Sequence, residues 1–206
     1  MNSDEVRRGW ADRSGAYSPA YYAYHGPDAR SEWVTRAVET RLGETGSVLE
    51  VGCSSGRHLE QFRRAGFDDL AGVELNPEAV SVMGEAFPEL ATVADVRVDG
   101  MASALADRPT DDVDVVYAVE TLQHVPPAST EAFEEIARVA GELVVTAENE
   151  GDGDHSDGSP GEVTHVDDDL PLFFRDWGRV FEAQGLDLVE TAATVDGRTT
   201  GRVFRV

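Results

Sequence analysis

A turn bracketed by two glycines is the stretch of the chain best suited to bind a ligand. Gly52 and Gly56 enclose residues 53–55, directly after the apolar run at residues 48–51, and Leu59 and Phe62 then recur at helical spacing. The pattern predicts a buried strand, a tight loop and a helix. Glycine tolerates positive φ and lets a ligand approach bare backbone, while the helix start offers unpaired N–H groups. We therefore expect a polar ligand at this loop, although a tight turn without a ligand would give the same pattern.

The spacing of the glycines discriminates between nucleotide cofactors. The dinucleotide fingerprint G-x-G-x-x-G would need glycine at Gly52, Ser54 and Arg57, and two of these positions fail. The pattern [D/E]-x-G-x-G-x-G is met by Glu50, Gly52 and Gly56, with Ser54 in place of its middle glycine. In this respect the chain resembles the class I S-adenosylmethionine-dependent methyltransferases, in their small-molecule, type 11-like branch.

Acidic residues end the next two expected strands. Glu74 closes a strand over residues 70–75 and lies 22 residues after Gly52, where a carboxylate can accept both ribose hydroxyls. Asp95 closes a strand expected over residues 91–96. The resemblance implies that Asp95 accepts from the adenine amine and that Val96 packs on the ring. A solvated acid at Glu74 and a loop-capping aspartate at Asp95 are the alternatives.

A fourth strand, expected over residues 113–119, leads into a loop that carries two titratable side chains, Glu120 and His124. The resemblance places this loop beside the methyl group. Histidine is the side chain that ordinarily titrates near neutral pH, so His124 could accept a proton from an attacking hydroxyl or amine, or it could simply cap the loop. The catalytic candidates are thus His124 and Glu120. The resemblance further implies a set of cofactor-binding residues: Glu50, Gly52, Cys53, Ser54, Gly56, Glu74, Leu75, Asp95, Val96 and Val119.

The periodicity predicts an α/β fold, a doubly wound and mostly parallel sheet. A helix over residues 31–42 precedes the first strand, strands and helices alternate to residue 146, and a hairpin over residues 186–191 and 200–206 follows around Asp196-Gly197. The resemblance implies a seven-stranded, Rossmann-like sheet whose seventh strand enters antiparallel between the fifth and the sixth.

Two segments outside this alternation are candidates for covering the site. Residues 1–30 form an arm before the domain at 31–206, and the resemblance makes Tyr21 and Tyr22 lid candidates. Residues 148–169 are acidic and glycine-rich, and we expect a solvated loop whose His165 could touch substrate. The segment starting at Asp152 has the wrong register for an EF-hand, so we predict no metal site.

The charge balance is strongly acidic. Among 206 residues, 17 are basic and 40 acidic, giving a net charge of -23, and every basic residue is arginine. Carboxylates covering a surface repel one another less at molar salt, where the Debye length falls to about 3 Å. The composition indicates a halophilic protein, with an ordinary acidic protein as the alternative. It argues against nucleic acid and anionic membranes as partners. Because no apolar leader or spanning segment is visible, we expect a cytoplasmic location.

The sequence therefore predicts an S-adenosylmethionine-dependent methyltransferase that acts on a small molecule by direct displacement at the sulfonium methyl. A nicotinamide-dependent oxidoreductase is the rival from another class of enzyme. A non-catalytic partner subunit that binds S-adenosylmethionine is the rival without turnover. Oligomeric state and acceptor do not follow from the sequence.

We expect removal of salt to unfold the protein, because unscreened carboxylates then repel one another across the folded surface. Circular dichroism during dialysis from concentrated KCl into dilute buffer measures this. Full helicity in dilute buffer would contradict the halophilic interpretation.

Overall fold

The computed structural model describes residues 2–151, 160, 162–166 and 170–206. The first half of the chain forms α1 (Ser3–Ala11), α2 (Pro19–His25), α3 (Ala29–Leu42), β1 (Ser47–Val51), α4 (Arg57–Arg64), β2 (Asp69–Glu74), α5 (Glu78–Ala86), the 3-10 turn η1 (Leu90–Thr92) and β3 (Asp95–Val98). The second half forms α6 (Met101–Ala106), β4 (Val113–Val119), η2 (Leu122–His124), α7 (Glu131–Val139), β5 (Ala140–Glu148), β6 (Glu162–Val166), β7 (Leu170–Phe174), α8 (Trp177–Glu182), β8 (Asp187–Ala192) and β9 (Thr200–Arg205).

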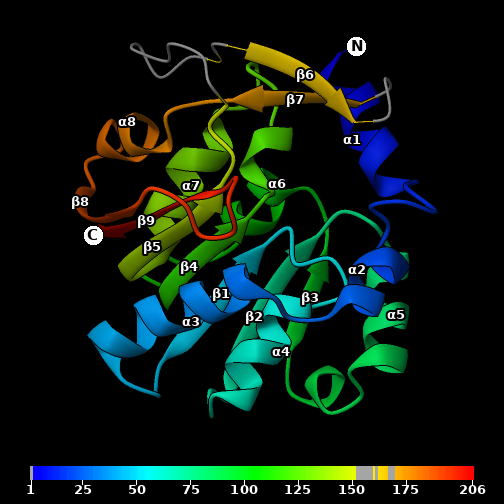
Figure 1. Cartoon of the computed structure of the whole chain (residues 1–206), viewed down its shortest axis with the longest axis horizontal. Coiled ribbons are helices and arrows are strands. Elements are labelled where there is room, and N and C mark those ends of the chain that lie inside the picture. Colours follow the sequence, from blue (N-terminus) through cyan, green and yellow to red (C-terminus); the bar gives the residue numbers. More distant parts are fainter. Residues whose placement is uncertain (1, 152–159, 161, 167–169) are drawn as a thin grey trace.

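Seven strands form one twisted sheet in the order β3-β2-β1-β4-β5-β9-β8 (Figure 1). The pairs from β3 to β5 are parallel, whereas β9 runs antiparallel to both β5 and β8. The predicted architecture is confirmed, including the late strand inserted beside β5. Because β1 and β4 are neighbours, the loops that leave their carboxyl ends meet at one edge of the sheet.

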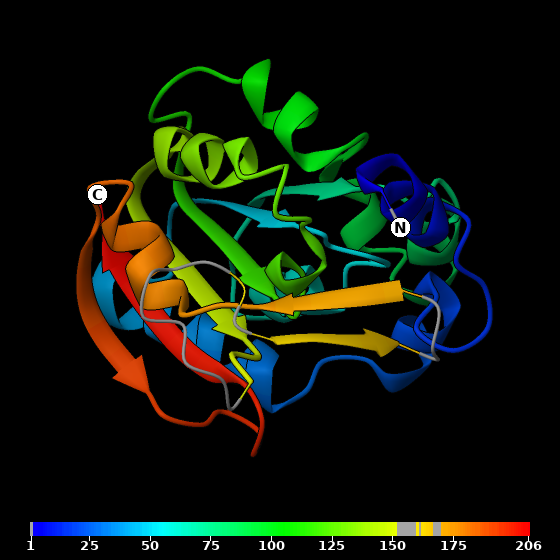
Figure 2. The same cartoon turned by 90° about the horizontal axis from the view of Figure 1, so that it is seen from above.

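Helices cover both faces of the sheet. In Figure 2, α6 and α7 lie on one side and α3 on the other. The central strand β4 is buried on both faces: Val116 and Ala118 pack into the core under α6, α7 and α8, while Val115 and Tyr117 pack into the core under α3 and α4. This alternation along a strand whose only charged residue is Asp114 is the pattern of a parallel sheet covered on both sides.

The third strand does not lie where the sequence placed it. Residues 90–92 form the turn η1, in which Leu90 is fully buried, and β3 starts at Asp95 instead of ending there. The strand pairs with β2 from Ala71↔Asp95 to Glu74↔Val98. As an edge strand, β3 is half exposed, so its apolar signal is weak and the neighbouring buried turn was mistaken for it. Consequently Asp99, and not Asp95, follows its carboxyl end.

Part of the segment predicted to be a loop forms a strand. Residues 162–166 make β6, which pairs antiparallel with β7 in a separate two-stranded sheet. Its β-branched residues Val163, Thr164 and Val166 are typical of a strand and explain the difference. The EF-hand-like stretch lies almost wholly outside the described residues. In the described part of the chain, no helix is both long enough and apolar enough to cross a membrane.

The N-terminal arm contains more helix than its pattern suggested. Two helices, α1 and α2, lie in this arm, which the sequence analysis treats only as a covering segment. A capping box starts α1: the Glu5 amide donates to the Asn2 side chain at 2.9 Å, and the Asn2 amide donates to the Glu5 carboxylate at 2.7 Å. Asparagine followed three residues later by glutamate is a recognised signal for the start of a helix. The helix α3 likewise starts earlier than predicted, because Asp28 caps it.

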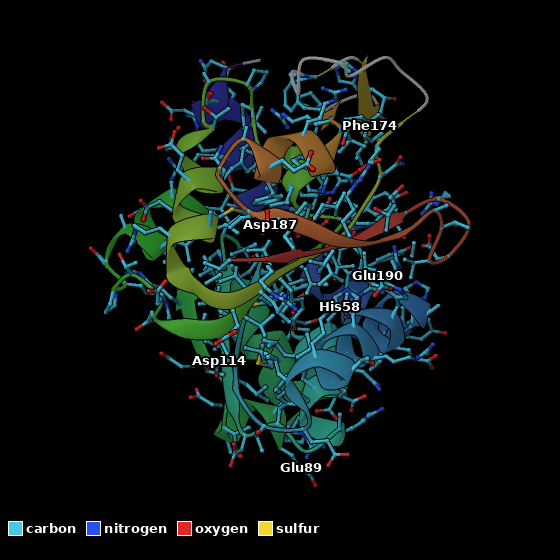
Figure 3. All side chains as sticks on the ribbon, turned by 90° about the vertical axis from the view of Figure 1, so that its left-hand side faces the viewer. His58, Glu89, Asp114, Phe174, Asp187 and Glu190 are labelled. Atoms are coloured by element: carbon cyan, nitrogen blue, oxygen red, sulfur yellow. The ribbon has the colours of Figure 1, made fainter. Side chains whose placement is uncertain are left out.

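Acidic side chains surround the molecule. Glu89 and Asp187 are exposed at its periphery, and Figure 3 shows how widely such carboxylates are spread. Several arginines on this surface pair with carboxylates, as in the 2.8 Å contact between Arg63 and Glu60. Isolated surface pairs contribute little individually.

Candidate functional site

The glycine loop between β1 and α4 is held by contacts on both sides. Gly52 has φ +72°, and a Cβ there would come within 2.2 Å of the Thr121 side chain. Ser54, which replaces the middle glycine of the pattern, also adopts a positive φ of 49°. The amides of Gly52 and Cys53 donate to the Val73 carbonyl at 2.7 and 3.1 Å. The loop therefore presents bare backbone to the cavity. Its Gly52 and Cys53 N–H groups are already hydrogen-bonded to β2.

The carboxylate of Glu74 fixes the geometry of two loops. It accepts from the Ser54 amide in the glycine loop at 2.7 Å and from the amides of Leu75 and Asn76 at 2.7 and 2.8 Å. Burial raises the pKa of Glu74, against the opposing effect of these amides. A carboxylate has about four acceptor positions, so Glu74 keeps capacity for a ligand hydroxyl.

Asp99 occupies the position that the sequence assigned to Asp95. It follows the carboxyl end of β3, accepts from Ser103 Oγ at 2.9 Å and from the Gly100 amide at 2.7 Å, and lines the cavity. The hydrogen bonds from Ser103 and Gly100 lower the pKa of Asp99, so it remains an ionised acceptor at neutral pH. Asp95 is exposed at the opposite end of the strand, and the assignment of a ligand contact to Asp95 is therefore corrected.

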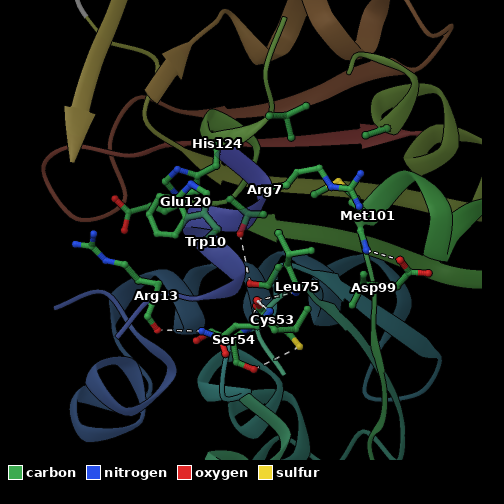
Figure 4. Close-up of a pocket in the computed structure, with 18 of the residues that line it drawn as sticks. Arg7, Trp10, Arg13, Cys53, Ser54, Leu75, Asp99, Met101, Glu120 and His124 are labelled. Carbon is green, nitrogen blue, oxygen red and sulfur yellow. Dashed lines mark hydrogen bonds between the residues drawn. The ribbon is translucent and has the colours of Figure 1, made fainter. Parts of the chain in front are cut away.

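A cavity of about 230 Å³ lies between these loops and the N-terminal helices, and Figure 4 shows part of its lining. Nine of the residues predicted from the sequence line it: Tyr22, Gly52, Cys53, Ser54, Glu74, Leu75, Val119, Glu120 and His124. The structure thus gathers residues from four separate segments at the carboxyl edge of the sheet.

Other candidates lie outside the cavity lining. Glu50 is fully buried and accepts from the Tyr117 hydroxyl at 3.1 Å, and burial raises its pKa. Gly56 starts α4, and a Cβ there would meet the Met83 side chain at 2.6 Å. These two residues support the loop from behind. The remaining candidates outside the lining are Asp95, Val96, Tyr21 and His165.

Glu120 leaves β4 with φ +48° and forms ion pairs instead of projecting freely into the cavity. Its carboxylate contacts the guanidinium of Arg30 at the start of α3 and lies 3.7 Å from that of Arg198 in the turn between β8 and β9. Arg30 also pairs with Asp28 and lies 3.5 Å from Asp196. This cluster ties three distant segments together, so Glu120 is poorly placed to serve as a base.

His124 lies under the N-terminal helix. Its ring centroid is 4.1 Å from that of Trp10, and Figure 4 shows the two rings together beside Glu120. Burial lowers the pKa of His124 to about 4, so the imidazole is neutral at neutral pH. Within the described part of the chain, its Nδ1 atom and the indole Nε1 of Trp10 are buried without hydrogen-bond partners.

The loop that carries His124 is anchored by Glu148 at the end of β5. This carboxylate is fully buried and accepts from the amides of Thr121 and Leu122 at 2.8 and 3.0 Å. Burial, together with the charge of Glu120, raises the pKa of Glu148 to about 8 against the opposing effect of these amides. From the sequence, Glu148 is expected only at the start of a loop. The apolar run before it indicates instead that Glu148 ends a strand.

The N-terminal helix α1 supplies a wall that the sequence analysis missed. Val6, Arg7 and Trp10 line the cavity, followed by Arg13 and Tyr17. The carbonyl of Arg13 accepts from the Asn76 side chain at 3.0 Å, which attaches this arm to the loop after β2 (Figure 4).

The fold and the cavity define a nucleoside-binding α/β protein. Residues 22–191 match the family model described as a methyltransferase domain, and the chain belongs to this family. Among solved structures it is similar to the 1,6-didemethyltoxoflavin-N1-methyltransferase of Burkholderia thailandensis, with bound S-adenosylhomocysteine, at 14% identity, TM-score 0.69 and coverage of 98% of this chain and 86% of that one. It is also similar to a SAM-dependent methyltransferase from Aquifex aeolicus, at 16% identity, TM-score 0.65 and coverage of 92% and 99%.

One curated relative matches more closely over a shorter region. The dTDP-4-amino-2,3,4,6-tetradeoxy-D-glucose N,N-dimethyltransferase of Saccharopolyspora spinosa is 35% identical where it aligns, over 43% of this chain. The chain matches 39% of the length of that relative. Together these likenesses support S-adenosylmethionine as the cofactor. The site fits it chemically, because ribose hydroxyls and the adenine amine are donors, and Glu74 and Asp99 are acceptors.

The pKa of Glu148 makes stability depend on pH. An unfolded glutamate titrates near pH ~4.3. The folded pKa of about 8 is higher. This group therefore contributes stability in acid that is lost as the pH rises through the interval between the two values. We expect Glu148→Gln, which keeps an acceptor for the two amides, to flatten the fall in Tm between mildly acidic and mildly alkaline buffer.

Glu142→Gln is the matched control, since Glu142 is an exposed glutamate on the same strand. Thermal unfolding in concentrated KCl should give this variant the wild-type pH profile. Identical profiles for Glu148→Gln and the wild type would show that Glu148 does not titrate as described.

Proposed function

We propose that this protein is an S-adenosylmethionine-dependent methyltransferase that acts on a small molecule. The observation that carries the proposal is the position of Glu74 and Asp99, which end adjacent strands β2 and β3 and line one cavity with the glycine loop. This arrangement supports recognition of an adenosine by its ribose and its base.

The residues that would bind the cofactor have separate roles. Glu74 accepts from the ribose hydroxyls, Asp99 accepts from the adenine amine, and Leu75 and Val119 pack on the apolar parts. Bound S-adenosylmethionine supplies a methyl group already activated by a positively charged sulfur. The chain therefore contributes mainly alignment and exclusion of water, and alignment alone can be worth about 7–11 kcal/mol.

His124 is the proposed proton acceptor, in a supporting role. Its neutral imidazole lines the cavity, and a neutral ring nitrogen can take a proton from an acceptor hydroxyl or amine. Glu120 is assigned a different role, because its pairing with Arg30 supports anchoring of the loop to α3.

Residues 1–30 are proposed to cover the site, with residues 31–206 as the methyltransferase domain. Tyr22 supports this role because its ring lies 4.8 Å from the Arg57 guanidinium at the cavity wall. Tyr21 contacts Tyr22 but lies outside the lining. His165 is exposed on β6, so it could contact the substrate only if the acceptor extends beyond the cavity.

The acidic surface without lysine supports a further proposal, that the protein works at high salt in the cytoplasm. The same negative charge disfavours nucleic acid as a partner.

Calorimetry tests the proposal in concentrated KCl. Saturable binding of S-adenosylhomocysteine without binding of NAD supports it, and the reverse result would establish the nicotinamide alternative. Release of labelled methyl groups to a panel of small acceptors then separates an enzyme from a partner subunit that only binds the cofactor.

Two aspartates at opposite ends of β3 provide a sharp test of the adenine site. We expect Asp99→Asn to weaken S-adenosylhomocysteine binding about tenfold, since a charge-assisted hydrogen bond contributes about 1.5–3 kcal/mol and the amide retains an acceptor oxygen. Asp95→Asn, at the exposed start of β3, should leave the affinity within about twofold. A larger loss from Asp95→Asn would restore the assignment made from the sequence.

Two histidines provide the corresponding test of proton transfer. With the first acceptor found in the panel, we expect His124→Ala to lower kcat by about 10²- to 10⁴-fold with unchanged cofactor affinity. The control His165→Ala replaces an exposed histidine outside the cavity lining. If both variants turn over at the wild-type rate, alignment suffices and His124 has only a structural role.

A further inference from the structure

A continuous series of ring contacts runs from His124 to the molecular surface. Beyond the contact of 4.1 Å between His124 and Trp10, the Arg13 guanidinium lies 6.0 Å from the Trp10 ring and 5.7 Å from the Tyr17 ring. Ring centroids then follow at 5.4, 4.5 and 5.5 Å along α2. We call this series the aromatic track; its members are His124, Trp10, Arg13, Tyr17, Tyr21, His25 and Tyr24.

The inner part of the track lines the cavity, whereas the outer part is exposed. Trp10, Arg13 and Tyr17 belong to the cavity lining. Tyr17, Tyr21 and Tyr24 are 39%, 37% and 88% exposed. Packing within the fold explains buried aromatic rings, but it does not explain a row of exposed ones that starts at a cavity.

The backbone at the cavity mouth is strained in a way that positions one of these rings. Tyr17 has φ +63°, a left-handed conformation that is unfavourable for a non-glycine residue. It places the Tyr17 ring between Arg13 and Tyr21. Strain of this kind persists where the surroundings impose it, and it is concentrated at ligand-binding sites.

The size of the cavity indicates that the acceptor extends onto the track. The cavity of about 230 Å³ is smaller than a typical small-molecule pocket of about 300–1,000 Å³, and it also has to take the cofactor. Part of the acceptor is therefore expected at the mouth, where Tyr17 and Tyr21 are exposed. Planar rings stack well on tyrosine.

We propose that the methyl acceptor is a molecule with a planar aromatic ring, which stacks on Tyr17 and Tyr21 at the mouth of the cavity. This inference rests on the proposed methyltransferase function. It assigns acceptor selection to the N-terminal arm.

The test is a titration of the full chain, saturated with S-adenosylhomocysteine in concentrated KCl, with para-hydroxybenzoate, catechol and glucosamine. We expect the two aromatic compounds to bind and glucosamine not to bind. Tyr17→Leu should weaken aromatic binding about fivefold to tenfold, whereas Tyr17→Phe, which keeps the ring, should stay within about twofold. Val189→Thr, at an exposed position on β8, is the surface control.

Three results would overturn the proposal: preferential binding of glucosamine, no binding of either aromatic compound, or equal affinities for Tyr17→Leu and Tyr17→Phe. Binding of S-adenosylhomocysteine to each variant is measured separately. A chain that binds this product but no aromatic ring fails the present inference alone, whereas a chain that does not bind it fails the proposed function.

Discussion

The carboxylate of Glu74 is the interaction on which the site depends. Three backbone amides from two loops converge on it, so the glycine turn after β1 and the exit of β2 keep a fixed separation. Asn76 extends the arrangement to the N-terminal arm through the carbonyl of Arg13. The side chain proposed to bind the ribose is thereby also the one that orders the cavity wall. Loss of Glu74 would leave three donors without an acceptor, which is more costly than loss of a single exposed hydrogen bond.

A second constraint acts at the exit of β4. Glu148 lies below the loop and accepts hydrogen bonds from two of the loop's amides. The ion pair between Glu120 and Arg30 holds the loop from the side. Arg30 sits at the start of α3, at the end of the N-terminal arm. The loop with His124 is consequently held from the sheet on one side and from the arm on the other. In a chain whose only cation is arginine, such forked guanidinium contacts are well suited to join several acids.

The central strands and the glycine loop could be predicted because their signals are local and redundant. An apolar run, a glycine turn and helical spacing all agree between Val48 and Phe62. The edge strand β3 could not be placed, because half-exposed Val96 and Val98 look no more strand-like than the buried turn at Leu90. The cavity-lining residues at the ends of regular strands could therefore be predicted. Asp99 could not, because the third strand was expected to end at Asp95. Trp10 and Arg13 were missed because only tertiary packing brings α1 over the cavity.

The two sides of the cavity have different structural origins. Strand ends of the central sheet supply Glu74, Asp99 and Val119, and any shift there would disturb the buried cores. The opposite wall comes from α1, α2 and the segment between them, which supply no buried residue to either of the two cores. Mutation can therefore remodel this wall without changing a buried residue of those cores. Such a protein can change the molecule it modifies during evolution while inheriting its donor site intact.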